Sequence, residues 1–302
     1  ASAKSAAFDK TGTITNGQLT VDQVVPVIGI APTDLLQLAA SAEQESSHIL
    51  ARSLVKAAQV EQLQPIETLK EATGAGVVAT LSSGQSVRVG KHQFVTPDAQ
   101  QPLQEQTTVY VAINDQYAGY ITFIDHLRPE APATMQTLHQ LGITRLMMLT
   151  GDQATTAHQI AEQVGIDDVH AGCLPVDKIH LIEQVPQDQR PLIMVGDGVN
   201  DAPSLASADV GIAMGAHGAT AASESADVVI LKDDLGRVSR AVQIARDTMR
   251  VARQAVLIGI AICIGLMLIA STGIVPALVG ALFQEVVDTV SILYALRART
   301  DR

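Results

Sequence analysis

The sequence predicts an α/β protein in which a parallel sheet is interrupted by an inserted α+β segment and followed by a transmembrane helical hairpin. After Gly119, strand-like and helix-like segments alternate, which is typical of a parallel sheet covered by helices. Residues 24–119 instead begin with a helical periodicity and continue with strand patterns. From Gln254 to Ser271 the chain is uncharged and mostly apolar, which is long enough to cross about 30 Å of hydrocarbon.

The individual segments follow this scheme. In the inserted part, a helical pattern starts near Thr33, the expected cap, and strand patterns cover residues 76–83, 85–91 and 107–115. After Gly119, helices are expected over residues 133–143 and 155–166, and strands over residues 146–150, 169–175 and 192–196. Parallel strands need helical crossovers between them, so this order favours a single parallel sheet.

Composition excludes several classes of function. The chain of 302 residues has 20 Lys and Arg against 31 Asp and Glu, a net charge of −11, so no nucleic-acid partner is expected. Cys173 and Cys263 lie far apart without CxxC or Cys/His spacing, which indicates a reducing compartment and no structural zinc or disulfide framework. The GxxxxGK[ST] phosphate loop is missing, so ATP would have to be held in another way.

A heptapeptide near the start of the chain carries the strongest chemical signal. Residues 9–15 read DKTGTIT and follow a short apolar run, which places Asp9 at the end of a predicted strand. Such an aspartate can attack a γ-phosphate and become an aspartyl-phosphate, provided that Mg²⁺ and fixed donors neutralise the oxygens around it. We therefore expect Asp9 to be phosphorylated.

Two further segments supply groups that suit a phosphate. Thr150 ends an apolar run, and its hydroxyl, with the next amides of Gly151 and Asp152, can form a concave nest for phosphate oxygens. Lys178 supplies a compact cation. Either segment alone is a weak signal, because a turn tripeptide and a surface lysine are common.

The segment GDGVNDAP directly follows the buried-strand pattern LIMVG and is a poor candidate for a merely structural loop. Its carboxylates, Asp197 and Asp201, lie at the end of a predicted parallel strand, where hard oxygen ligands suit Mg²⁺. Gly196 and Gly198 allow the loop to turn sharply.

Together these motifs, in this order and spacing, resemble the P-type ATPases and their haloacid-dehalogenase-like phosphorylation domain over the whole chain. The resemblance implies Asp9, Thr11 and Asp197 as the Mg²⁺ set. It adds Lys10 and Asn200 to the catalytic residues, which are then Asp9, Lys10, Thr11, Thr150, Gly151, Asp152, Lys178, Asn200 and Asp201. Thr11 stands where related phosphatases place a second aspartate, and a hydroxyl does not serve as a base at pH 7, so the phosphoenzyme is expected to persist.

The resemblance also implies a division into domains. Residues 1–23 and 120–248 would form the phosphorylation domain, residues 24–119 the nucleotide-binding domain, and residues 249–302 two transmembrane helices at about 254–272 and 274–296. Asp125 and Arg128 match a hinge-proximal motif and are expected to join the two soluble domains by an ion pair.

The inserted segment resembles the small nucleotide domain of the heavy-metal-transporting branch. Glu43, His48, Gly74 and Gly76 occur in that order, and the resemblance implies that they hold ATP. An imidazole can stack on adenine, a carboxylate can accept from its amine, and glycines let the backbone approach the sugar and phosphates. The chain departs from the usual His-Pro pair, because Ile49 follows His48.

The carboxyl-terminal hairpin predicts a multi-pass membrane protein, in the cell membrane, with cytoplasmic catalytic domains. Arg250 and Arg253 precede the spans, and Arg297, Arg299 and Arg302 follow them, which puts both ends in the cytoplasm. The second span carries a polar face made of Gln284, Glu285, Asp288 and Ser291. Intramembrane carboxylates commonly mark ion paths, so Glu285 and Asp288 are candidate ligands of a transported cation. The alternative to a role in transport is that these carboxylates form hydrogen bonds to a neighbouring helix.

The expected function is ATP-driven transport of a cation, most readily a transition metal, by a chain that looks truncated. The family's actuator domain and first six membrane helices would have to come from the same or a separate chain. Three alternatives remain open: a potassium-pump catalytic subunit, a haloacid-dehalogenase-type phosphatase, and a non-catalytic regulatory remnant. Thr11 and the hairpin disfavour the phosphatase, and the complete set of phosphate-site residues disfavours the remnant.

Overall fold

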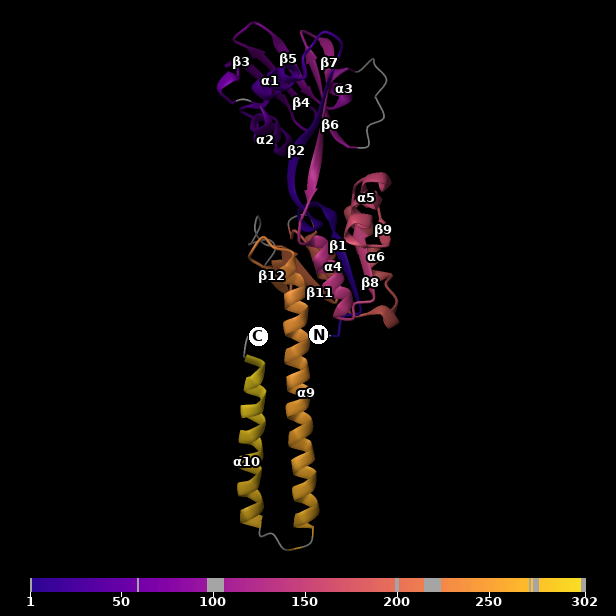
Figure 1. The fold of residues 1–302 in the computed structure, drawn as a ribbon, viewed down its shortest axis with the longest axis vertical. Coiled ribbons are helices and arrows are strands. Elements are labelled where there is room, and N and C mark those ends of the chain that lie inside the picture. Colours follow the sequence, from indigo (N-terminus) through magenta and orange to yellow (C-terminus); the bar gives the residue numbers. More distant parts are fainter. Residues whose placement is uncertain are drawn as a thin grey trace.

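The structure is a computed structural model that describes residues 2–58, 60–96, 106–198, 201–214, 224–271, 273 and 277–299. A six-stranded parallel sheet lies between a six-stranded antiparallel sheet and a pair of long helices, so that the molecule is elongated (Figure 1). The predicted fold class is confirmed.

The parallel sheet has the order β12-β11-β10-β1-β8-β9, and all of its strand pairs are parallel. From β1 the chain builds one side of the sheet and then crosses to the other, which makes β1 the switch point where ligands bind in such sheets. The strands are β1 (Ser5–Asp9), β8 (Arg145–Leu149), β9 (Asp168–His170), β10 (Leu192–Gly196), β11 (Val210–Met214) and β12 (Val228–Ile230).

Helices cover both faces of this sheet, because alternate residues of its strands are apolar on both sides. Phe8 belongs to the core under α4, α5 and the start of α9, whereas Ala7 belongs to the core under α6 and α7. Both side chains are fully buried. These helices are α4 (Ala131–Gln140), α5 (Ala154–Val164), α6 (Pro175–Glu183), α7 (Ala202–Ser207) and α9 (Gly236–Ala270).

The antiparallel sheet has the order β2-β7-β6-β5-β4-β3 and a core of its own against α1 and α2. Helix α1 begins at Pro32, one residue before the expected cap Thr33, because the fixed φ of proline suits the first helical position. The elements are β2 (Thr15–Pro26), α1 (Pro32–Glu43), α2 (Ile49–Ala57), β3 (Ile66–Ala72), β4 (Gly76–Leu81), β5 (Ser86–Gly90), α3 (His92–Val95), β6 (Thr107–Ile113) and β7 (Gln116–Leu127).

The two sheets are joined by the long paired strands β2 and β7 (Figure 1). Strand β2 starts directly after the segment that follows Asp9, and Thr15 pairs with Leu127. The expected domain limits at residues 23/24 and 119/120 therefore fall inside these strands. Short helical turns complete the soluble part: η1 (Lys10–Ile14), η2 (Val60–Gln62) and η3 (Gln187–Gln189), while η4 (Leu296–Arg299) follows α10.

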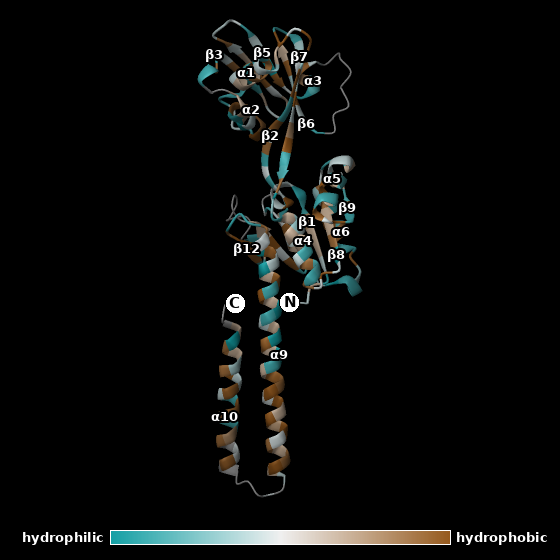
Figure 2. Ribbon diagram, viewed as in Figure 1, coloured by the Kyte–Doolittle hydropathy of each residue, from teal (hydrophilic) through white to brown (hydrophobic). Residues whose placement is uncertain are grey.

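Helix α9 leaves the parallel sheet and continues as an apolar rod, brown in its distal half (Figure 2). Among the described residues it is the one helix long and apolar enough to cross a membrane. It begins at Gly236, well before the predicted span at Gln254, so the expected limit at 248/249 lies inside one continuous helix. Helix α10 (Ala277–Ala295) runs beside it, and the Tyr294 hydroxyl lies 3.0 Å from Gln254 Oε1. Ile274, the expected start of the second span, and Arg302 lie outside the described residues.

Candidate active site

The candidate site lies at the carboxyl end of β1, between β8 and β10. Asp9 is the last residue of β1 and is 7% exposed. It pairs in register with Leu149, and the preceding Phe8 pairs with Val195. Because the ends of parallel strands share one edge, the TGD segment after β8 and the GDG segment after β10 start beside Asp9. The sheet thus brings together motifs separated by more than a hundred residues.

Lys178, on α6, contacts two carboxylates at once. Its Nζ lies 2.6 Å from Asp9 Oδ1 and 2.7 Å from Asp201 Oδ1. The lysine side chain is only 11% exposed, so these are charge-assisted contacts in a partly dry site. Lys178 is therefore not a solvated surface lysine.

The electrostatics of this cluster favour a poised nucleophile. Burial and the nearby charge of Asp201 raise the pKa of Asp9 to about 7, against the opposing effect of Lys178. Burial alone would lower the pKa of Lys178, but the carboxylates of Asp9 and Asp201 outweigh it and raise that pKa. Asp197 adds a further negative charge near Asp9. Lys178 is thus held between two acids, Asp9 and Asp201, and Asp197 adds its charge on Asp9.

The second lysine, Lys10, is held away from the nucleophile. Its ammonium forms an ion pair with Asp152 and lies 3.8 Å from Asp125 Oδ2. The Thr15 hydroxyl lies 2.6 Å from the same Asp125 oxygen and 2.9 Å from the Lys10 carbonyl oxygen. These contacts tie the DKTGT segment to β7 and to the TGD turn. The sequence had predicted an ion pair of Asp125 with Arg128 instead.

Thr150 is buried in the TGD turn, with 1% exposure. Its hydroxyl accepts a hydrogen bond from the Asp152 amide at 3.1 Å, and its carbonyl accepts from the Cys173 amide at 2.9 Å. These hydrogen bonds fix the turn, and the ion pair of Asp152 with Lys10 joins it to the segment after Asp9. Gly151 lies between these two residues in the same turn.

The GDG loop closes over the site from β10. A Cβ on Gly196 would lie 2.8 Å from Asp201 Cβ, so only glycine fits there. A Cβ on Gly12, whose φ is +74°, would lie 3.5 Å from Asp197 Cβ, so the DKTGT loop packs directly over that aspartate. Asn200 lies outside the described residues.

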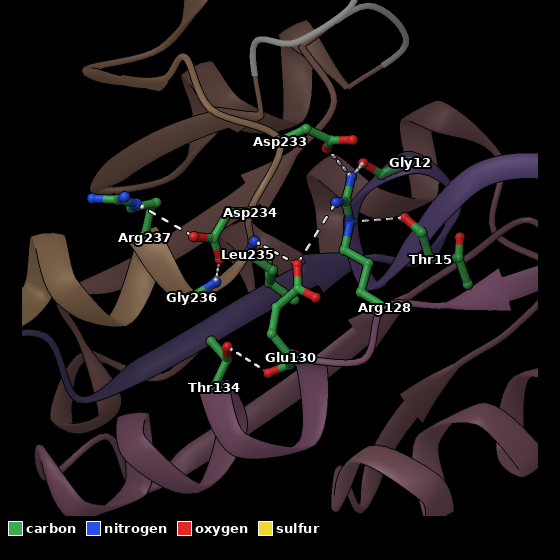
Figure 3. Close-up of polar contacts among 10 residues, drawn as sticks. All are labelled: Gly12, Thr15, Arg128, Glu130, Thr134, Asp233, Asp234, Leu235, Gly236 and Arg237. Atoms are coloured by element: carbon green, nitrogen blue, oxygen red, sulfur yellow. Dashed lines mark hydrogen bonds and ion pairs between the residues drawn. The ribbon is translucent and has the colours of Figure 1, made fainter.

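Arg128 corrects one expectation, because it does not pair with Asp125. Its guanidinium lies 2.5 Å from Asp233 Oδ1 and donates to the carbonyl oxygens of Gly12 and Thr15 at 3.3 and 3.2 Å (Figure 3). Glu130 lies 3.8 Å from the same guanidinium and accepts from the Leu235 amide at 3.1 Å, just before α9. The cluster therefore links the segment after Asp9 to the start of α9.

The expected nucleotide residues belong to the end of α1, the start of α2 and the turn that leads from β3 into β4. Glu43 ends α1 and is 8% exposed, and His48 caps α2 by accepting from the Leu50 amide at its Nδ1. A Cβ on Gly74 would meet nothing within 4 Å, which leaves room for a ligand. A Cβ on Gly76 would lie 2.2 Å from the Val89 carbonyl oxygen. Strand packing already requires a glycine at position 76.

In the hairpin, polar side chains of α9 and α10 face one another. Cys263 Sγ lies 3.7 Å from Gln284 Oε1, and Gln284 Nε2 lies 3.5 Å from Asp288 Oδ1. Glu285 is the next residue along α10, and its side chain is exposed, as is that of Asp288. Across the described residues, no group of three or more His, Cys, Asp or Glu side chains is arranged to hold a metal ion.

Comparison with known proteins now assigns the chain. A family model of haloacid dehalogenase-like hydrolases matches residues 3–209. The chain belongs to this family. The cadmium, zinc and cobalt-transporting ATPase of Bacillus subtilis (strain 168) is 37% identical over 258 residues, which are 83% of this chain and 37% of that protein. The copper-exporting P-type ATPase of Mycobacterium leprae (strain TN) is 36% identical over 82% of this chain and 32% of its own length.

Solved structures agree with these relatives. A zinc-transporting PIB-type ATPase in its E2.Pi state has a TM-score of 0.80 and 31% identity, over 98% of this chain and 50% of that one. The catalytic domain of the CPx-ATPase CopB-B has a TM-score of 0.66 and 28% identity, over 80% of this chain and 89% of that domain. The predicted resemblance to heavy-metal-transporting P-type ATPases is confirmed. The chain spans about a third to a half of the length of the full pumps that it matches.

A first prediction concerns Lys178 and the ionisation of Asp9. Only an ionised Asp9 can attack phosphorus, so phosphorylation should fall as the pH drops through the pKa of Asp9. Because Lys178 lowers that pKa, Lys178→Gln should move the midpoint of this acid limb upward by about 1–3 pH units. The measurement is the rate of phosphoenzyme formation from acetyl phosphate against pH. Lys4→Gln, at a lysine bonded to the Asp188 carbonyl oxygen, is the control, and an unchanged midpoint in Lys178→Gln would contradict the assignment.

Proposed function

We propose that this chain is the ATP-using part of a P-type ATPase that moves a transition-metal cation across a membrane, through a phosphoenzyme on Asp9. The observation that carries the proposal is the contact of Lys178 with both Asp9 and Asp201 at the switch point of the sheet. The heavy-metal-transporting relatives support the class of cargo. Zinc, cadmium, cobalt, copper and silver all occur in the names of these relatives, so the ion itself is not selected.

In the proposed reaction, a carboxylate oxygen of Asp9 attacks the γ-phosphorus of ATP in line with the bridging oxygen. A bond forms between Asp9 and phosphorus, the bond to the bridging oxygen breaks, and ADP leaves with that electron pair. Lys178 offsets charge that would otherwise gather between Asp9 and the phosphoryl oxygens. The rigid TGD turn, held by Thr150 and by the ion pair of Asp152 with Lys10, positions the other side of the phosphoryl group.

The residues present fit a Mg²⁺ ion. Asp197 is close enough to Asp9 for its negative charge to raise the pKa of Asp9. Asp201 Oδ2 is buried and has no hydrogen-bond partner among the described residues. Mg²⁺ binds through one or two carboxylates, waters and substrate phosphates. Asp9 and Asp197, with the backbone at Thr11, would hold it, and it would supply Lewis-acid neutralisation of the phosphate oxygens.

Release of the phosphate is expected to be slow in the chain alone. Thr11 provides a hydroxyl where a phosphatase would need a carboxylate base to activate water. The full pump would supply the base from its actuator region, in the same or a separate chain. Persistence of the intermediate is what allows phosphorylation to bias a membrane bundle between two access states.

The second prediction tests this assignment directly. The full chain in detergent, given ATP and Mg²⁺, should form a hydroxylamine-sensitive phosphoenzyme, and Asp9→Asn should abolish it because the amide is not a nucleophile. Gel analysis of the labelled protein at acid pH gives the measurement. Asp22→Asn, at an acid of β2 outside the site, is the matched control. Rapid multiple-turnover release of phosphate would instead favour the phosphatase alternative.

For the nucleotide base, we propose Glu43, His48, Gly74 and Gly76 as the site, with Gly74 the position most open to a ligand. Burial raises the pKa of Glu43 to about 7, with a smaller contribution from Glu71 and against a hydrogen bond from Ser46. An ionised Glu43 accepts a hydrogen bond from the exocyclic amine of adenine, whereas the protonated acid competes as a donor. The affinity for ATP should therefore depend on pH near neutrality.

A third prediction follows from this pKa. The affinity for ATP should fall by about tenfold per pH unit below 7 in the unaltered chain, because the folded site must first lose a proton to bind. Glu43→Gln should flatten this profile, and His48→Ala should weaken binding at every pH. Calorimetry on the full chain gives the affinities. Glu45→Gln is the control. Phosphorylation by acetyl phosphate should be unchanged in the Glu43 and His48 variants. If the affinity of Glu43→Gln for ATP still depends on pH, the proposed role of Glu43 is rejected.

For the cargo, we propose that Glu285 and Asp288 contribute to a cation path in the membrane, with the multi-pass protein placed in the cell membrane. The contacts support Asp288 most, since Gln284 contacts both Asp288 on α10 and Cys263 on α9. A Cβ on Gly259 would lie 3.1 Å from the Ser291 hydroxyl, so the helices are close at this seam. Ionisable groups inside a bundle commonly mark ion paths.

The fourth prediction addresses these acids in a reconstituted full-length pump. Asp288→Asn and Glu285→Gln should lower metal-stimulated phosphorylation by about tenfold, the effect of losing one charged ligand contact. ATP binding should be unchanged, because the nucleotide site lies in a different domain. Thr289→Ala, whose hydroxyl bonds only within its own helix, is the control. Normal metal dependence in both acid variants would remove them from the path.

A further inference from the structure

A cleft of about 510 Å³ opens between the two soluble domains, beside the phosphorylation segment. One wall is formed by α2, and the other by the loops that carry Thr11, Gly12 and Asp197. The charged side chains that line it are Arg52, Lys56, Arg128, Asp197 and Asp233. Arg128 is already engaged with Asp233 and with backbone oxygens (Figure 3).

Arg52 and Lys56 are different, because nothing in the described part of the chain neutralises them. Both side chains are exposed, and neither forms an ion pair or a hydrogen bond with a described residue. Helix α2 itself contains no acid. The two cations are four residues apart and so lie on the same face of the helix, an arrangement that disfavours an isolated helix. Two unpaired cations on one cleft-facing surface indicate an anionic ligand.

Helix α2 is held in place relative to the phosphorylation segment. The Ser53 hydroxyl donates to the Leu19 carbonyl oxygen of β2 at 2.5 Å. Strand β2 begins immediately after the segment that follows Asp9. The first residue of the same wall, Ile49, follows His48, which caps the helix and belongs to the proposed base site. One helix therefore runs from the proposed base site along the cleft that faces the phosphorylated residue.

We propose that Arg52 and Lys56 form a phosphate-binding pair that holds the α- and β-phosphates of ATP in this cleft. The guanidinium of Arg52 can make two parallel hydrogen bonds to phosphate oxygens, and Lys56 adds a compact charge. The pair binds the part of ATP that leaves as ADP, so it orients the γ-phosphate toward Asp9. This inference rests on the proposed function, because it takes ATP as the phosphate donor.

The experiment compares Arg52→Gln, Lys56→Gln and the double variant with Lys70→Gln, an exposed lysine of β3 outside the cleft. Calorimetry on the full chain carrying Asp9→Asn, which prevents turnover, measures affinity for AMP, ADP and ATP. Each cleft variant should lose about tenfold in affinity for ATP and ADP, the effect of one charge-assisted hydrogen bond. Affinity for AMP, which keeps the α-phosphate but lacks the β-phosphate, should fall by less than affinity for ATP and ADP, and Lys70→Gln should bind all three nucleotides normally.

A second measurement, with Asp9 intact, is phosphoenzyme formation from ATP and from acetyl phosphate. The half-saturating ATP concentration should rise about tenfold in each cleft variant, whereas acetyl phosphate, which has no diphosphate, should label all variants equally. Unchanged ATP affinity in the double variant would overturn the proposal. Arg52 and Lys56 would then be assigned to binding an acidic segment of the actuator region. An equal loss in Lys70→Gln, an equal loss for AMP, or an equal loss with acetyl phosphate would also overturn it.

Failure of the proposed function has a separate signature. If the unaltered chain forms no hydroxylamine-sensitive phosphoenzyme from either donor, the assignment of Asp9 fails. The series of AMP, ADP and ATP affinities still decides whether Arg52 and Lys56 bind phosphates.

Discussion

The contact of Lys178 with Asp9 and Asp201 is the interaction on which the rest of the site depends. It joins the end of β1 to α6 and to the start of α7 across the switch point of the sheet. Without the lysine, two mostly buried carboxylates would lack a partner of opposite charge. Removing one partner of a buried ion pair costs about 3–5 kcal/mol. The same contact tunes the nucleophile, because it opposes the effects of burial and of Asp201 on the pKa of Asp9.

A second constraint links this site to the long helix. Arg128 donates to the carbonyl oxygen of Gly12, within the DKTGT segment, to that of Thr15, which follows it, and to the side chain of Asp233, while Glu130 accepts from the amide of Leu235 (Figure 3). Helix α9 then continues without interruption from the parallel sheet into its apolar half. The loop after Asp9 is therefore connected to the start of α9 by direct side-chain contacts.

The connection between the sheets places the proposed nucleotide site relative to Asp9. Strands β2 and β7 hold the antiparallel sheet over the site, and α2 is bonded to β2 through Ser53. The proposed base site at the start of α2, the cleft and the loop after Asp9 are therefore arranged one after another. In the proposed function, this arrangement would let separate groups of residues bind the base and the phosphates of ATP.

The sequence by itself determined the fold class and the residue types at the phosphate site. Hydrophobic periodicity is local, so it predicted several of the strands and helices of both sheets, and the DKTGT, TGD and GDG segments pointed to Asp9 and its surroundings. Segments over residues 76–83 and 107–115, for example, correspond closely to β4 and β6.

Partners and boundaries were decided only by the tertiary structure. The pairing of Asp125 with Lys10, and of Arg128 with Asp233, joins residues more than a hundred positions apart, and strand order rather than local pattern sets such contacts. The start of α9 at Gly236 also escaped prediction, because its first turns are amphipathic and pack on the sheet through Val238 and Val242 before the uncharged run begins. Gly76 shows the same limit. A larger residue at position 76 would collide with the Val89 carbonyl oxygen. Only the pairing of β4 with β5 brings that oxygen close.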